Sequence, residues 1–234
     1  MNLSLPRSFP IAKAALAAAV IACVVALTCS LTGCASGGTD GSSADADNTS
    51  ASTDGKALRV AMELAYPPFE TKDDAGNPEG LAVDFIRDFG AAYGYDVQIE
   101  NTAWDGLIPS LQSDKADLVI SSMTITDERK QSVDFSDAYA MAQLAILANA
   151  DSGVASIDDL NQPGKKVAVK TGSTGDVYAT KNLTNAEIVR LADESACVTE
   201  VVQGKADGFL YDQLTIYRNH QANPDTTAAV FIPL

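Results

Sequence analysis

The chain has 234 residues, 46% of them hydrophobic and 20% charged, which is typical of a globular protein with one or two modest domains. Its formal net charge of -15 at pH 7 argues against nucleic acid partners, because phosphate binding requires clustered lysine and arginine side chains. An acidic surface of this kind favours solubility.

The N-terminus has the pattern of an export signal. Arg7 and Lys13 precede the uncharged run AALAAAVIACVVALTCSL, and small residues follow at a candidate cleavage site. The alternative is a transmembrane anchor, since residues 14–31 are about as long as the shortest spanning helix. The tetrapeptide LTGC that ends at Cys34 resembles the lipobox of bacterial lipoproteins. This resemblance implies cleavage before Cys34, lipidation of that cysteine, and attachment of the protein to a membrane outside the cytoplasm.

We therefore expect residues 1–33 to be a lipoprotein signal peptide and residues 34–56 to be a flexible tether. The tether is almost entirely Gly, Ser, Thr, Ala and Asp and shows no apolar periodicity. Beyond Cys34, the mature chain has Cys197 as its one further cysteine and His220 as its one histidine. These residues provide no metal-ligand spacing and no nucleophile with its base, so we expect neither a metal nor a cofactor. His220 is expected at the surface near a helix end.

After the tether, short apolar runs alternate with helical patterns, which favours an α/β fold. The first part, residues 57–142, is predicted to contain strands at residues 58–63, 95–100 and 116–121, with helices at residues 83–94 and 104–114. Gly94 is expected to end the first of these helices.

The same alternation recurs in residues 143–234. An apolar strand at residues 141–148 is expected to cross from the first part to the second. It is followed by predicted strands at residues 165–170, 186–191 and 207–212 and by helices at residues 177–182 and 195–203. Two α/β lobes are implied, with a ligand cleft at the carboxyl ends of their strands.

Polar and aromatic residues are expected at those strand ends, and Arg129 is central among them. Its planar guanidinium binds a carboxylate through two parallel hydrogen bonds, and Asp212 is suited to a positive group on the same ligand. Together these charges suit an α-amino acid. Alternatives remain for single residues: Arg129 as a solvated helix residue, Trp104 as core, and Glu63 as a surface acid. The segment TGSTG lacks the lysine of a P-loop, which argues against nucleoside triphosphates.

Several segments resemble the polar amino-acid family of bacterial solute-binding proteins, which feed ABC importers. The segments are YPPFE at residues 66–70, WDGLIPSLQSDKADLVISSMTITDERKQSVDFSDAY at residues 104–139, KKVAVKTGST at residues 165–174, and KADGFLYD at residues 205–212. The resemblance implies a two-lobed fold of the periplasmic-binding-protein type II class that closes on its ligand by a hinge motion. It also implies a monomer whose partners are a free amino acid and the permease subunits of an importer.

The resemblance also implies roles for single residues. Arg129 would hold the α-carboxylate with Thr124 and Thr174, and Asp212 would hold the α-ammonium near Ser122. Tyr66 and Trp104 would form aromatic walls along the ligand. Glu63 would contact the far end of the ligand's side chain, which would be cationic or an amide. The full set of expected ligand-binding residues is Glu63, Tyr66, Trp104, Ser122, Met123, Thr124, Arg129, Ser173, Thr174 and Asp212.

Two departures from the family pattern lead to further expectations. Family members usually have GFDVD where this chain has GLAVD at residues 80–84, a change expected to affect packing only. Family chains also continue past the segment that ends at Leu234 and return to the first lobe, so we expect a truncated fold with low stability and weakened binding. The alternatives to a receptor are a non-functional fragment and an enzyme like the cyclohexadienyl dehydratases, in which Glu63 would assist the loss of water and carboxylate.

Overall fold

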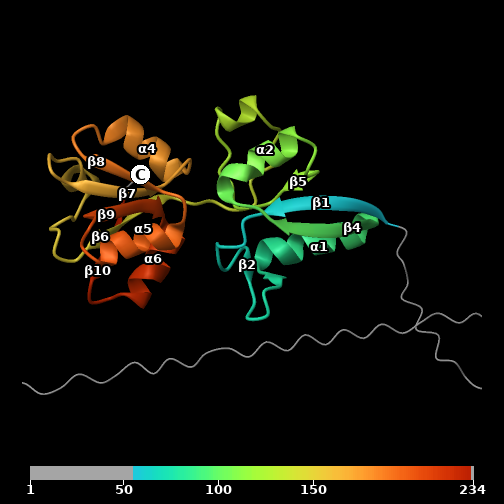
Figure 1. Ribbon diagram of the computed structural model, residues 1–234, viewed down its shortest axis with the longest axis horizontal. Coiled ribbons are helices and arrows are strands. Elements are labelled where there is room, and N and C mark those ends of the chain that lie inside the picture. The colour runs from blue at the N-terminus through green and yellow to red at the C-terminus, as the bar shows by residue number, and fades with distance from the viewer. Residues whose placement is uncertain (1–54, 233–234) are drawn as a thin grey trace, which may run out of the picture. The chain divides into compact units, whose positions relative to one another are not determined.

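The computed structural model describes residues 55–232 (Figure 1). The expected signal peptide, Cys34 and nearly all of the expected tether lie outside the described residues. Across residues 55–232, none of the helices has the length and apolar character needed to cross a membrane.

The first lobe is built on a parallel sheet with the strand order β4-β1-β5. Its strands are β1 (Lys56–Met62), β4 (Tyr95–Asn101) and β5 (Leu118–Val119), and its helices are α1 (Leu81–Tyr93), the 3-10 turn η1 (Trp104–Gly106) and α2 (Leu107–Gln112). Side chains alternate across β1, so Val60 and Met62 pack in one core with α1, while Ala61 packs in another with Leu107 of α2. The sheet therefore has a helix on each face, as Figure 1 shows.

Small elements complete this lobe. A hairpin of β2 (Thr71–Lys72) and β3 (Pro78–Glu79) follows the loop after β1, and the 3-10 turn η2 (Arg129–Gln131) follows β5. Gly94 ends α1 in the left-handed conformation at φ 73°, which confirms the predicted helix end.

The second lobe has a five-stranded mixed sheet with the order β10-β6-β9-β7-β8. Its strands are β6 (Leu144–Asn149), β7 (Lys166–Lys170), β8 (Glu187–Leu191), β9 (Gly208–Asp212) and β10 (Thr227–Phe231), and its helices are α3 (Ile157–Leu160), α4 (Thr174–Asn182), α5 (Glu194–Val202) and α6 (Gln213–Ala222). Strands β7, β8 and β9 are parallel, whereas β6 is antiparallel to both β9 and β10.

Two hydrophobic cores lie on opposite faces of this sheet and explain why its strands are apolar. One core includes Cys197 and Ile216 from α5 and α6, and the other includes Leu160 and Ala179 from α3 and α4. Because helices cover both faces, strands such as β6 and β7 read as continuous apolar runs instead of alternating ones.

The structure differs from the sequence-based prediction at several boundaries. The strand expected at residues 116–121 is reduced to β5, because only Leu118 and Val119 pair with β1. The crossing strand begins at Leu144, three residues later than expected. His220 was expected at the surface, and this is wrong in part, since His220 is half-buried with its Nδ1 atom 3.2 Å from the Thr227 hydroxyl.

Candidate ligand-binding site

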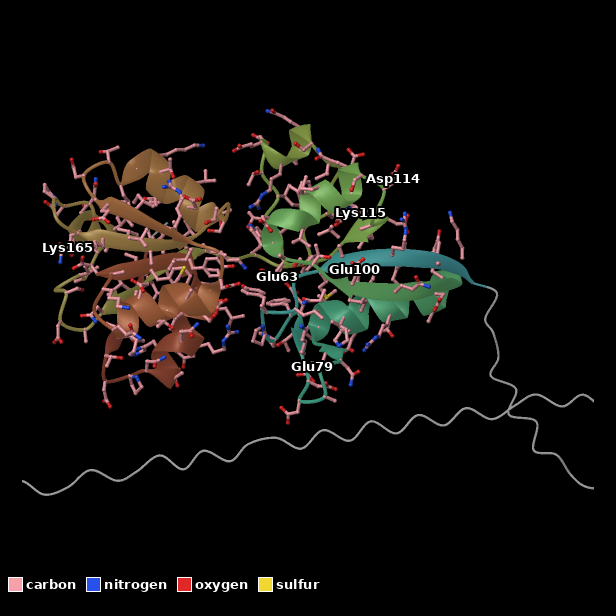
Figure 2. All side chains as sticks on the ribbon, in the orientation of Figure 1. Glu63, Glu79, Glu100, Asp114, Lys115 and Lys165 are labelled. Carbon is pink, nitrogen blue, oxygen red and sulfur yellow. The ribbon has the colours of Figure 1, made fainter. Side chains whose placement is uncertain are left out.

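The candidate site lies where strand ends of the two lobes contact each other through their side chains. Glu63 directly follows β1, and Figure 2 shows it at the carboxyl end of that strand. Lys170 ends β7 in the other lobe, and its ammonium forms an ion pair with the Glu63 carboxylate. Carboxyl ends of parallel strands are the usual place for ligands in open α/β sheets. The sequence-based reasoning did not identify Lys170 as part of this site.

The Glu63–Lys170 pair is largely removed from water. The exposed fraction of the side chain is 3% for Lys170 and 15% for Glu63. The Lys170 ammonium also lies 5.4 Å from the centre of the Trp104 ring, which is within range of a cation–π attraction. Glu63 is therefore held by a cation of the protein itself and is not a free surface acid.

Arg129 is held in a fixed position on η2. Its Nη1 atom donates to the carbonyl of Thr124 at 2.8 Å, and its Nη2 atom donates to the carbonyl of Gly172 in the second lobe at 3.0 Å. The guanidinium carbon lies 5.4 Å from the centre of the Trp104 ring, and burial lowers the pKa of Arg129. These two bonds use two of the five N–H groups of the guanidinium, so the charge stays available for an anion. Arg129 is half-buried and bonded to two backbone carbonyls, unlike a solvated helix residue.

The loop before α4 is held by hydrogen bonds to Asp176. The Ser173 hydroxyl caps α4 by accepting from the Asp176 N–H at 3.2 Å, and the Gly172 N–H donates to the Asp176 carboxylate at 3.0 Å. Ser173 is thus buried as a helix cap. Thr174 is half-buried at the start of α4, where the helix dipole favours an anion.

Asp212 has one carboxylate oxygen that is used and one that is not. It caps α6, and its Oδ1 atom accepts from the N–H groups of Leu214 and Thr215, both at 3.0 Å. Its Oδ2 atom is buried and has no hydrogen-bond partner among the described residues. A buried carboxylate oxygen without a donor is costly, because it has lost water without replacement. The Tyr66 hydroxyl lies close to the Asp212 carboxylate without meeting hydrogen-bond geometry, and the pKa of Tyr66 is raised by burial and by its proximity to the charge of Asp212.

The remaining predicted residues lie around these charged groups. Thr124 is exposed and contributes its carbonyl to Arg129, while Met123 packs against the small core that includes Leu107. Tyr66 stacks on Phe69 with ring centres 5.7 Å apart. Ser122 adopts a left-handed backbone conformation at φ 49°, which is rare for a residue other than glycine and typical of functional loops.

Glu70 is a further buried acid that sequence reasoning did not assign to the site. Its side chain is fully buried, and its Oε2 atom accepts from the Ser122 hydroxyl at 3.0 Å, while Oε1 has no partner among the described residues. The Ser122 N–H in turn donates to the Tyr139 hydroxyl at 2.9 Å. Burial raises the pKa of Glu70 to about 8, with a further contribution from Glu63 that Lys170 and Ser122 oppose. The YPPFE motif was a possible signal for Glu70, but an acid beside two prolines is typical of an exposed turn.

We expect Glu70 to make the protein less stable as the pH rises from about 4.5 to about 8. Unfolded Glu70 releases its proton near its ordinary pKa of 4.5, whereas folded Glu70 holds it until about 8, so the free energy of unfolding falls between these values. Urea denaturation at pH 5, 7 and 9 should show this fall in the wild type and a smaller fall in Glu70→Gln. The control is Glu79→Gln, an exposed acid on β3 (Figure 2). Equal pH slopes for Glu70→Gln and the wild type would contradict the expectation.

Residues 58–222 match the family model of the bacterial extracellular solute-binding proteins, family 3. The chain belongs to this family. It is 37% identical over 176 residues to a probable histidine-binding protein of Neisseria gonorrhoeae, an alignment that covers 74% of this chain and 65% of the relative. It is 26% identical over 173 residues to a cyclohexadienyl dehydratase of Pseudomonas aeruginosa, covering 73% of this chain and 65% of that enzyme. The chain thus spans about two thirds of the length of these relatives.

Comparison with solved structures establishes the fold of this chain. An ancestral arginine-binding protein bound to glutamine superposes with a TM-score of 0.69 at 34% identity, covering 75% of this chain and 78% of that chain. The predicted α/β fold of the periplasmic-binding-protein type II class is therefore confirmed. Most of the similar proteins of this family are named as binding proteins, although the dehydratase is an enzyme.

Proposed function

We propose that this protein is an extracytoplasmic receptor that binds a polar amino acid and delivers it to the permease of an ABC importer. The observation that carries the proposal is the unpartnered, buried Oδ2 atom of Asp212, in a site that also contains the fixed guanidinium of Arg129. An α-amino acid has the two complementary charges, since its ammonium suits Asp212 and its carboxylate suits Arg129. Relatives named for histidine and arginine binding support an amino acid as the ligand class.

The Glu63–Lys170 pair supports a neutral polar side chain on this amino acid. If Glu63 were free, it would attract the cationic end of an arginine or lysine ligand. Lys170 already neutralises it, and the pair offers one acceptor and one donor side by side. A carboxamide has a matching N–H donor and carbonyl acceptor, so an amide side chain fits this end of the site better than a cationic one. A similar ancestral arginine-binding protein has been solved bound to glutamine, which is consistent with such a ligand.

Isothermal titration of the purified protein against the common amino acids tests this function. We expect heat of binding for at least one polar amino acid, with amide side chains ahead of cationic ones. The absence of binding to every amino acid would count decisively against a receptor of this kind.

Replacing Lys170 by methionine should change the preference of the site. Methionine keeps much of the apolar stem but leaves Glu63 without a cation, so arginine and lysine should gain affinity relative to glutamine by about 10-fold or more. Competition titrations with the three amino acids measure this ratio. The matched control is Lys165→Met, because Lys165 pairs with Asp207 at the opposite end of β7 (Figure 2). An unchanged ratio in Lys170→Met would remove Lys170 and Glu63 from the specificity argument.

The dehydratase in the family makes an enzyme the second candidate. Its acid would be Glu63, which here is bound to a lysine of the opposite lobe. Prephenate and arogenate are the substrates to test, and a rate of turnover that disappears in Glu63→Gln would favour the enzyme over the receptor.

The lipid anchor is part of the same proposal and rests on the LTGC sequence that ends at Cys34. A cysteine with several acyl chains binds a membrane stably, because each buried methylene contributes about 0.8 kcal/mol. Expression of the full chain with a radioactive fatty acid should label the wild type and leave Cys34→Ala unlabelled. Equal labelling of both proteins would exclude Cys34 as the lipid site.

A further inference from the structure

Arg218 joins the two lobes at a place outside the predicted ligand contacts. It lies on α6, and its Nη2 atom donates to the Glu194 carboxylate at 3.0 Å within the second lobe. Its Nη1 atom donates to the backbone carbonyl of Pro67 in the first lobe. The guanidinium therefore bridges an acid of one lobe and a carbonyl of the other, a geometry that suits the rigid fork of arginine.

Glu194 holds Arg218 firmly in this position. It is the first residue of α5, and its carboxylate also accepts from Asn219 at 3.1 Å and from the Thr215 hydroxyl at 3.4 Å, both on α6. The side chain of Glu194 is only 12% exposed. Because two other side chains of α6 also bond the acid, the direction in which Arg218 reaches the first lobe is fixed as well.

The Pro67 carbonyl belongs to the loop that carries the Tyr66 wall. Tyr66 and Glu70 close this loop through hydrogen bonds between their backbones, at 2.7 Å and 3.0 Å. The Tyr66 hydroxyl lies near Asp212, the residue before α6. The bond from Arg218 to Pro67 and the approach of Tyr66 to Asp212 therefore connect the same loop, residues 66–70, to the same helix, α6.

We propose that Arg218 is a latch that strengthens ligand binding by holding the two lobes together, without contacting the ligand. This inference rests on the proposed receptor function. A bond that forms only when the two lobes meet stabilises the closed state relative to the open state. Because the ligand is bound in the closed state, such a bond increases the affinity for the ligand. The bonds that Arg129 and Lys170 form between the lobes come from residues of the site itself. A change at Arg218 therefore tests the contact between the lobes without removing a proposed ligand contact.

The variant Arg218→Met keeps the apolar stem and removes the bridge. We expect the affinity for the best-binding amino acid to fall about 10-fold, the scale of one hydrogen bond from a charged donor. The loss should come from faster dissociation, and the ranking of amino acids should stay the same. The control is Arg59→Met, which removes an arginine that pairs with Asp117 at 2.7 Å inside the first lobe. We expect no change in affinity for this control.

A second measurement does not depend on the ligand. Spin labels at Asp74→Cys and Gln221→Cys, two exposed positions on the β2–β3 turn and α6, report the distance between the lobes. We expect a longer or broader distance distribution in Arg218→Met than in the wild type. Unchanged affinity together with an unchanged distribution would overturn the latch. If the wild type binds no amino acid at all, the proposed function fails, and the label distances alone decide whether Arg218 holds the lobes together.

Discussion

The variant Asp212→Asn should bind amino acids at least about 100-fold more weakly than the wild type while keeping its fold. Asparagine caps helices as well as aspartate does, so its amide oxygen can replace Oδ1 in accepting from Leu214 and Thr215. The amide nitrogen then replaces Oδ2 and presents a donor to the ammonium of the ligand. Loss of one partner from a buried ion pair typically costs about 3–5 kcal/mol, which corresponds to more than 100-fold in affinity.

Titration calorimetry measures the affinity of this variant, and thermal unfolding reports its stability. Asp212→Ala provides the contrast, because alanine removes the cap as well and should lower the stability by about 1 kcal/mol. Asp193→Asn is the matched control for charge, since Asp193 is an exposed acid at the N-cap of α5 without a side-chain capping bond. Full affinity in Asp212→Asn would show that the ammonium is bound elsewhere.

The strand ends that build the site could be predicted from the sequence because their strands are buried on both faces. The runs KVAVK and GFLYD are apolar throughout their centres, and each leads directly into polar residues. Asp212 could be placed in the site for this reason, as the last residue of such a run. Its second role as a helix cap follows from the local sequence, because its Oδ1 atom bonds residues two and three positions later.

The Glu63–Lys170 pair could not be predicted in the same way. The two residues are 107 positions apart, and their contact depends on how the two lobes meet. In KKVAVK, alternation alone does not show which lysine lies in the site and which at the opposite end of the strand. Glu70 was missed because its hydrogen-bond partner Ser122 lies 52 positions away and has an unusual backbone conformation. Long-range pairing of charged groups leaves little trace in a single sequence.

Ser173 has a local role as a helix cap that was not predicted from the sequence. The Ser173 hydroxyl and the Gly172 N–H both bond Asp176. The serine three residues before an acid is the usual pattern of a capped helix start. The Ser173 hydroxyl accepts in this cap and still has its own O–H to donate, so its role toward an anion stays a prediction.

Replacing Arg129 by alanine should abolish amino acid binding, with an expected loss of more than about 100-fold, while the fold remains largely intact. Arg129 is half-buried on a short 3-10 turn and belongs to none of the hydrophobic cores of the described residues. Arg129→Lys should recover little affinity. The ammonium of lysine is a compact group and cannot donate to the carbonyls of Thr124 and Gly172 and also form two parallel hydrogen bonds with a carboxylate. Lys130→Ala, at the exposed neighbouring position, is the control and should bind normally.

An analogue of the best-binding amino acid, with its α-carboxylate converted to a carboxamide, identifies the group that Arg129 holds. The wild type should bind this analogue far more weakly than the amino acid, because the charged partner of the guanidinium is gone. Arg129→Ala should bind the analogue and the amino acid about equally, since neither can then form the ion pair. If the losses of binding free energy from Arg129→Ala and from the carboxamide analogue are additive, the α-carboxylate does not contact Arg129. Only groups in contact are coupled in a double-mutant cycle of this kind.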